Sequence, residues 1–213
     1  MIFTETRLKG AYVVQIQKII DERGSFGRSW CQREFAEHGL NPSIIQMNVA
    51  SNHRRGTLRG MHYQLAPYAE AKYIRCTRGA IYDVIIDLRA GSPTYGESQG
   101  LELTPENGRM IYAPEGFAHG YQTLEDDTEI CYMTSFAYAP AAARGVRYDN
   151  PAFGIHWPLP VSVISAADQA WPDFPSRDIV PDVCGRDIVP DVLSKQGSAQ
   201  DAGNGVPTKE IQP

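Results

Sequence analysis

The sequence predicts an all-β domain, a β-barrel or β-sandwich with little helix. Between residue 2 and about residue 160, short stretches of alternating apolar and polar residues recur at close intervals, separated by Gly, Pro, Asn and Asp. Such alternation is typical of strands with one buried face, because successive side chains of a strand point to opposite faces. Many close-set strands with so little helix favour a cupin-type jelly-roll β-barrel with short peripheral helices.

The alternation predicts eight strands and one short helix. The strands are expected at residues 11–20, 43–50, 57–64, 72–77, 80–88, 109–112, 119–124 and 129–136. The helix is expected over residues 30–38, with Ser29 placed to cap its first turn and Gly39 to end it.

The chain is predicted to form one domain, residues 1–175, followed by a tail, residues 176–213. Its 213 residues, 42% hydrophobic and 21% charged, have the balance of one globular domain with a sizeable core. In the tail, RDIVPDV at 177–183 recurs at 186–192, and two copies are too few for a solenoid. We expect this duplicated segment to lie on the domain or on a partner subunit. The polar, Gly-rich end beyond residue 195 is expected to be disordered, or an appended remnant.

Composition argues against several classes of partner. The net charge of −5 disfavours broad attraction to nucleic acid or anionic lipid but allows a local basic pocket for a small phosphate ligand. The first nine residues lack a secretory pattern, and no apolar run approaches the roughly 18 residues that span a bilayer. We therefore expect a cytoplasmic protein with a small-molecule partner. Reduced core thiols, rather than disulfides or a zinc site, are expected at the scattered Cys31, Cys76, Cys131 and Cys184.

Two expected strands place charged or ionisable side chains beside core residues. Lys72 shares a face with Ile74 and Cys76. Burying an ammonium there is unfavourable unless it is paired or meets a ligand, so Lys72 either extends to solvent from the strand end or faces a site. His62 shares a face with Gly60, which would leave room for a ligand.

Arg59 is the exception to this pattern. Strict alternation places it on the face opposite His62. It can enter the same pocket only through a bulge near Gly60.

Two further strands carry polar side chains on one face. Tyr132 and Tyr138 share a face with Ile130, so both phenols lie inside the barrel if that face is the inner one. Taken alone, Tyr132 fits an ordinary core tyrosine whose hydroxyl is satisfied better than a functional residue. Gln46 and Asn48 form a polar pair suited to hydrogen bonds with a ligand.

Taken together, these segments resemble a known enzyme family. The matching stretches are DERGSF at 21–26, QMN at 46–48, LRGMHYQ at 58–64, AKYIRCTRGAIYDVIIDLRAGSPTYG at 71–96, APEGFAHGYQTL at 113–124, the strand that carries both tyrosines, and DNPAFGIHWP at 149–158. They are similar to the nucleotide-sugar 4-keto-hexose epimerases, the dTDP-4-dehydrorhamnose 3,5-epimerase family. The resemblance implies an isomerase of deoxysugar biosynthesis that inverts C3, C5 or both in a nucleotide-diphospho-4-keto-6-deoxyhexose, without metal or cofactor.

The resemblance assigns four catalytic roles. His62 is the base, and Asp168, in the family's S-x-x-D pattern, orients its ring and makes the other ring nitrogen a better proton acceptor. Lys72 stabilises the oxyanion that forms as the 4-keto group enolises. Tyr132 is the acid on the opposite face of the sugar, so that removal and return of the proton invert the carbon.

The resemblance also assigns substrate contacts and an assembly. Arg23, Gln46, Asn48 and Arg59 match residues that hold the nucleotide diphosphate, and His119 matches one that lines the sugar site. The same resemblance adds Phe26 and Tyr138 to the substrate-binding residues. It further implies a homodimer in which an N-terminal strand is exchanged and helps to complete the partner's site.

Several positions depart from the family pattern. Arg28 stands where a glutamate on the base-recognition side is common, and Ala143 and Ala167 stand where a glutamate and an arginine are usual. The segment between Gln46 and Arg59 is one residue longer than usual. These departures leave open the nucleotide, dTDP, CDP or another, and the number of carbons inverted.

Two alternatives belong to other functional classes. PEGFAH at 114–119 resembles the second motif of metal-dependent cupins, but the first motif offers His62-Tyr63-Gln64 in place of a His-x-His pair, and a catalytic metal usually needs about three protein ligands. The other alternative is a non-catalytic nucleotide-sugar-binding cupin or a 3,4-ketoisomerase-like relative. The four candidate catalytic residues argue against it, because a pure binder needs no base and acid on opposed faces.

Overall fold

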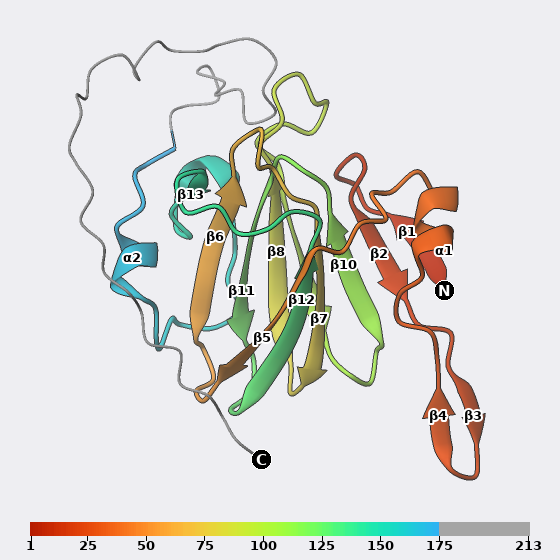
Figure 1. The fold of residues 1–213 in the computed structure, drawn as a ribbon. Coiled ribbons are helices and arrows are strands. Elements are labelled where there is room, and N and C mark those ends of the chain that lie inside the picture. The colour runs from red at the N-terminus through yellow and green to blue at the C-terminus, as the bar shows by residue number, and fades with distance from the viewer. Residues whose placement is uncertain (175–213) are drawn as a thin grey trace, which may run out of the picture.

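Two antiparallel sheets make up the body of the computed structural model, which describes residues 1–174 (Figure 1). The first sheet has the strand order β1 (Ile2–Glu5), β2 (Tyr12–Gln15), β10 (Arg109–Ala113), β7 (Lys72–Arg78), β12 (Thr128–Thr134) and β5 (Gln46–Asn52). The second has the order β13 (Ala143–Gly145), β6 (Leu58–Gln64), β11 (Phe117–Thr123), β8 (Ile81–Asp87) and β9 (Ser98–Leu103). The prediction of an all-β domain is confirmed. Both copies of RDIVPDV and Cys184 lie outside the described residues.

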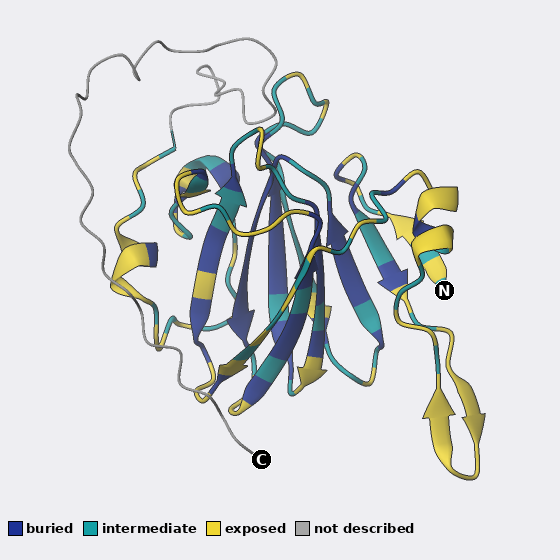
Figure 2. Ribbon diagram, in the orientation of Figure 1, coloured by how far each residue is buried: buried dark blue, intermediate teal, exposed yellow. Residues whose placement is uncertain are grey.

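The main core lies between the two sheets. Ile74 and Ile130 of the six-stranded sheet belong to one buried cluster with Ile81 and Ile85 of the five-stranded sheet. Much of strands β7, β8, β11 and β12 is dark blue, the colour of buried residues, in Figure 2. Each such isoleucine contributes about 1.5–3 kcal/mol of burial free energy.

Smaller elements cover parts of the outer faces. Helix α1 (Gln32–Glu37) packs Phe35 against Tyr73 and Tyr112 of the six-stranded sheet, with ring centroids 5.4 and 6.1 Å apart. The short 3-10 helix η1 (Pro151–Phe153) places Phe153 in a buried cluster with Met61 on the five-stranded sheet. Helix α2 (Ala166–Gln169) lies next to β6.

A separate hairpin projects from the body. Strands β3 (Ile19–Asp21) and β4 (Gly24–Phe26) pair only with each other among the described residues, and they extend away from the sheets in Figure 1. All six strand residues are exposed, and the side chains include three large apolar ones, with Ile19, Ile20 and Phe26 exposed by 69%, 78% and 77%.

The strand predicted over residues 11–20 is wrong in its extent. It is interrupted between β2 and β3, because the two strands that pair with β2, β1 and β10, both end opposite Gln15. Gln15 pairs with Ile2, the first residue of β1, and with Arg109, the first residue of β10. Beyond Gln15 the backbone has no partner strand and leaves the sheet toward the hairpin.

Helix α1 begins at Gln32, two residues after the predicted start, and it lacks the predicted cap. Cys31, not Ser29, is the N-cap residue of α1, and its side chain makes no capping hydrogen bond. Burial of Phe35 and ion pairs from Glu34 to Arg28 (2.7 Å) and to the Met1 amino group (3.0 Å) hold the helix instead. Gly39 ends the helix as predicted, with φ of +69° just after the C-cap.

Four strands, β1, β4, β9 and β13, are absent from the prediction. In β9 the apolar alternation is interrupted by Gly100, which reads as a break in a strand. The structure gives this glycine a packing reason, since a Cβ there would lie 2.0 Å from the Tyr82 hydroxyl on β8.

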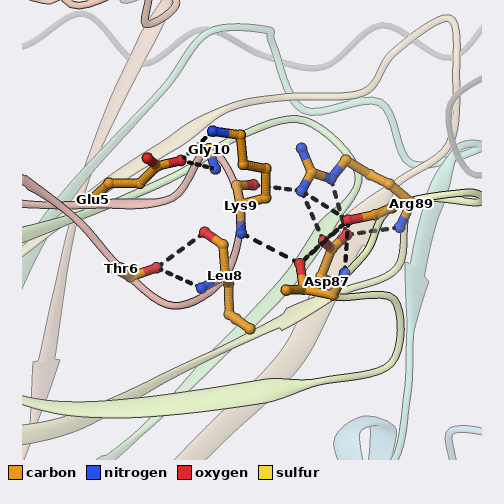
Figure 3. Close-up of polar contacts among 9 residues, drawn as sticks. Glu5, Thr6, Leu8, Lys9, Gly10, Asp87 and Arg89 are labelled. Carbon is orange, nitrogen blue, oxygen red and sulfur yellow. Dashed lines mark hydrogen bonds and ion pairs between the residues drawn. The ribbon is translucent and has the colours of Figure 1, made fainter.

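A buried polar network ties the N-terminal segment to the end of β8 (Figure 3). Asp87 is fully buried and accepts hydrogen bonds from Arg89 (Nη2, 2.7 Å), Ser92 (2.5 Å) and Thr94 (2.7 Å). Arg89 also donates to the carbonyl of Lys9 (2.5 Å). Burial alone would raise the pKa of Asp87, but the donors from Arg89, Ser92 and Thr94 outweigh it and lower the pKa. The carboxylate therefore joins two distant loops.

Two predictions from composition can be compared with the described residues. The cysteines at 31, 76 and 131 are free, and the last two are buried, as expected for core thiols. No helix in residues 1–174 is long and apolar enough to cross a membrane.

Candidate active site

A cavity of about 580 Å³ lies between the two sheets and collects most of the predicted site residues. All of the predicted residues except Arg23 and Phe26 line it: His62, Lys72, Tyr132, Asp168, Gln46, Asn48, Arg59, His119 and Tyr138. They come from β5, β6, β7, β11 and β12, from the segment after β12, and from α2.

His62 forms a dyad with Asp168. Nε2 of His62 lies 2.7 Å from Oδ1 of Asp168, and Nδ1 has no hydrogen-bond partner among the described residues. Asp168 sits in the first turn of α2, where Ser165 caps the helix by accepting a hydrogen bond from the Asp168 amide (3.0 Å). Burial raises the pKa of Asp168, but hydrogen bonding and charge from His62, together with the Gly60 amide, lower it overall. A charged carboxylate then holds the Nε2 proton, which leaves Nδ1 as the proton acceptor.

The bulge that Arg59 requires is present in β6. His62 pairs with His119 and Arg59 with Tyr121, so three steps along β6 oppose two along β11. Gly60, at the bulge, has φ of +128°, and a Cβ there would lie 2.5 Å from the Gly120 Cα. Only glycine fits this close approach of the two strands. The bulge brings Arg59 to the cavity, as predicted.

Lys72 is buried at the cavity and paired. Its side chain is 7% exposed, and its ammonium forms an ion pair with Glu70, whose side chain is 10% exposed. The alternative in which Lys72 extends to solvent is therefore wrong. The sequence analysis missed Glu70, although its position two residues before Lys72 places both side chains on one face of an extended segment.

Tyr132 faces the cavity from the sheet opposite His62. Tyr132 lies on β12 of the six-stranded sheet and His62 on β6 of the five-stranded sheet. The Tyr132 hydroxyl has no hydrogen-bond partner among the described residues, unlike an ordinary satisfied core tyrosine. Burial raises the pKa of this hydroxyl, the charge of Glu70 raises it further, and Arg59 opposes both. The phenol is therefore protonated and able to donate.

A second dyad, absent from the sequence analysis, joins His119 to Asp83. Nε2 of His119 lies 2.7 Å from Oδ2 of Asp83 on β8. Burial raises the pKa of Asp83, and the contact with His119 only partly offsets it. The signal for Asp83 was a charged residue on the same strand face as Ile81 and Ile85, which is costly without a partner.

The predicted nucleotide contacts form a polar cluster at β5. Gln46 donates to Asn48 (3.0 Å) and accepts from the Tyr138 amide (3.1 Å). The Nδ2 group of Asn48 is buried without a partner among the described residues. Arg59 donates through Nε to Asn52 (2.8 Å) and has no acidic partner among the described residues.

Arg23 and Phe26 lie apart from the cavity. Both belong to the hairpin that projects from the body in Figure 1, and Arg23 pairs with Asp21 at 2.5 Å with its side chain 84% exposed. Within one chain the structure does not bring them to the other site residues. Arg28, a departure from the family pattern, likewise pairs with Glu34 away from the cavity.

The rest of the cavity lining is mixed, with Ala143, Ala167 and Trp171 beside the charged Arg144. Ala143 and Ala167, the two other departures, both line the cavity. Trp171, which the sequence analysis did not select, lies with its ring centroid 6.4 Å from that of His62. No group of three or more His, Cys, Asp or Glu side chains in residues 1–174 is arranged to hold a metal ion.

Comparison with known proteins places this cavity in a family context. Residues 5–176 match the family model described as dTDP-4-dehydrorhamnose 3,5-epimerase. A dTDP-4-dehydrorhamnose 3,5-epimerase of Sinorhizobium fredii is 39% identical, over 81% of this chain and 89% of the relative. A dTDP-4-dehydrorhamnose 3-epimerase of Streptomyces niveus is 36% identical, over 76% of this chain and 78% of the relative.

Solved structures agree with these matches. The crystal structure of dTDP-4-dehydrorhamnose 3,5-epimerase from Elizabethkingia anophelis superposes with a TM-score of 0.79 at 34% identity, over 82% of this chain and 96% of the other. The Bacillus anthracis enzyme, solved with TDP and pyrophosphate bound, gives 0.78 at 34% identity, over 81% and 98%. ChmJ, a 3'-monoepimerase from Streptomyces bikiniensis solved with dTDP-quinovose, gives 0.73 at 34% identity, over 79% and 85%. The predicted cupin-type jelly roll is confirmed by these neighbours.

Proposed function

The chain belongs to the dTDP-4-dehydrorhamnose 3,5-epimerase family, and we propose that it inverts carbons beside the C4 ketone of a dTDP-linked 4-keto-6-deoxyhexose. The observation that carries the proposal is the opposition of His62 and Tyr132 across one cavity. A base held by a carboxylate comes from one sheet, and a protonated phenol comes from the other.

In the proposed first step, Nδ1 of His62 removes the proton from a carbon next to the ketone. The C–H electron pair moves into the new C=C bond of an enolate, and the negative charge develops on the C4 oxygen. The ammonium of Lys72 stabilises that oxygen, and a preorganised donor of this kind typically contributes about 3–4 kcal/mol to the transition state. Asp168 stabilises the imidazolium that His62 becomes.

In the proposed second step, the hydroxyl of Tyr132 gives its proton to the same carbon from the opposite face. The C–H bond re-forms with inverted configuration and the ketone is restored. His62 then loses its proton to solvent and the Tyr132 phenolate regains one. All three roles are filled by side chains of this chain: the base, the acid and the oxyanion donor.

The polar cluster at β5 and the unpaired guanidinium of Arg59 support a place for the nucleotide diphosphate. Arg59 carries a full charge toward the cavity, since its partner Asn52 is neutral. The unpartnered amide of Asn48 is a donor available to a ligand. The nucleotide-bound relatives make dTDP the first substrate to test.

The site is proposed to be completed by a second copy of the chain. The hairpin exposes apolar side chains at Ile19, Ile20 and Phe26, and edge strand β5 exposes Met47 and Val49, by 64% and 62%. Apolar surface of this kind is costly in water and favours association. An exchanged hairpin would carry Arg23 and Phe26 to a partner's cavity. A cytoplasmic location is also proposed, from the free thiols.

The test is incubation of the protein with dTDP-, CDP- and GDP-linked 4-keto-6-deoxy sugars in deuterium oxide, with exchange at C3 and C5 read by NMR. We expect deuterium at one or both carbons of the dTDP sugar, together with inverted product. Binding of a panel member without exchange at either carbon would contradict catalysis and favour the non-catalytic alternative.

A further inference from the structure

Glu70 is a carboxylate inside the cavity that the proposed reaction leaves without a role. Its side chain is 10% exposed and lines the cavity together with Lys72 and Tyr132. A charged group so deeply placed is costly unless it is paired.

The partner of Glu70 is the ammonium of Lys72. This is the one hydrogen bond of the Lys72 ammonium to another described residue. An ammonium has three N–H donors, so two remain for a ligand. The pair also restricts a four-carbon stem that would otherwise sample many rotamers. Glu70 thus holds the ammonium in place without occupying all of its donors.

The pair also divides the cavity electrostatically. Lys72 and Glu70 together are close to neutral, whereas two arginines line the same cavity without an acidic partner among the described residues. Arg59 donates to the neutral Asn52, and Arg144 donates to backbone carbonyls. A diphosphate carries concentrated negative charge, so it is attracted to Arg59 and Arg144 and repelled by Glu70. A neutral ketone experiences no such repulsion.

The charge of Glu70 also acts on Tyr132. Glu70 raises the pKa of the Tyr132 hydroxyl in addition to the effect of burial, while Arg59 lowers it. The carboxylate therefore helps to keep the phenol protonated.

Building on the proposed function, we propose that Glu70 is a positioning residue that reserves Lys72 for the C4 oxygen of the sugar and excludes the diphosphate from that end of the cavity. Glu70 touches no reacting atom in this scheme. It acts by fixing the position of the Lys72 ammonium and by balancing its charge.

The test uses Glu70→Gln, which keeps the size of the side chain and removes its charge, and inorganic pyrophosphate as the probe. By calorimetry, pyrophosphate should bind Glu70→Gln about tenfold more tightly than wild type, because Lys72 becomes an unpaired cation. The gain should vanish in Glu70→Gln/Lys72→Met. This readout requires no turnover, so it stands or fails separately from the epimerase activity. Unchanged pyrophosphate affinity in a folded Glu70→Gln protein would overturn the proposal.

Two further variants separate charge from position. Glu70→Asp keeps the charge on a shorter stem, so pyrophosphate affinity should stay near that of wild type while kcat for inversion falls about tenfold with little change in KM. Glu129→Gln is the matched control, since Glu129 lies on β12 with Tyr132 but outside the cavity lining. If Glu70→Asp and Glu129→Gln have the same kcat, the positioning role is wrong.

Discussion

His62 and His119 face each other directly across the antiparallel pair of β6 and β11, and each ring directs Nε2 to a different aspartate 2.7 Å away. The two dyads differ in their surroundings. The His62 side chain is 45% exposed, against 9% for His119. Accessibility therefore favours His62 as the group that meets substrate, with His119 as a fixed wall of the sugar site.

Replacing His62 with Ala is expected to abolish deuterium exchange into the substrate while the fold stays intact, because the acidic carbons lose the accessible base. Exchange is measured by NMR in deuterium oxide, and folding by thermal denaturation. His119→Asn is the matched comparison and should retain measurable exchange. If His62→Ala exchanges like wild type, the base is misassigned and His119 becomes the next candidate.

Asp168→Asn should slow exchange by about 10- to 100-fold without eliminating it, the range usual for losing a group that orients a functional histidine. The amide can still contact Nε2, but it no longer stabilises the imidazolium with a charge. The rate is compared with wild type across pH. An unchanged rate throughout that range would remove Asp168 from the dyad.

Tyr132→Phe should separate exchange from inversion. The substitution keeps the ring and removes the proton donor opposite His62, so abstraction continues while correct reprotonation fails. Inverted product should fall by about a hundredfold or more, within the range for losing an acid–base partner, while deuterium still enters at least one carbon. Inversion at the wild-type rate would show that Tyr132 is a core tyrosine, and Tyr138 would inherit the role.

Asp87→Asn is expected to destabilise the domain by about 3 kcal/mol at pH 7, because it breaks a buried charged network. The folded-state pKa of Asp87 is lowered, so its contribution is present above the unfolded pKa of about 3.9 and is lost as pH falls through the folded value. Urea denaturation should therefore show a gap between the two proteins that narrows below about pH 4. A gap that is constant down to pH 2 would contradict the ionised network.

Mixing two inactive variants should restore activity if the hairpin is exchanged. His62→Ala lacks the base, and Arg23→Ala lacks a hairpin contact expected in the partner's site. After the subunits exchange, a mixed dimer has one cavity with both groups, so turnover should exceed that of either variant alone. Light scattering checks that dimers form. No recovery from mixed dimers would place Arg23 and His62 in the same subunit's site or in none.

Much of the candidate site follows from sequence because strand alternation is a local property. A period of two residues assigns Lys72, His62 and Tyr132 to inward faces without any knowledge of which strands are neighbours. The motifs around these residues then place the chain in its family. The same periodicity failed at β9, where Gly100 interrupts the pattern for the sake of a side chain on the next strand.

The resemblance assigned Asp168 to His62, but the contacts themselves were decided by the tertiary structure. Asp168 lies 106 positions from His62, and Asp83 lies 36 positions from His119, so their contacts depend on how the sheets and α2 come together. Arg59 reaches the cavity because of the bulge, and the bulge is a register shift between β6 and β11 that arises only when the two strands pair. The sequence by itself determined the all-β class, the family and the residue types that face inward. The aspartate that holds His119 was decided by the tertiary structure, because Asp83 reaches that ring only from the neighbouring strand β8.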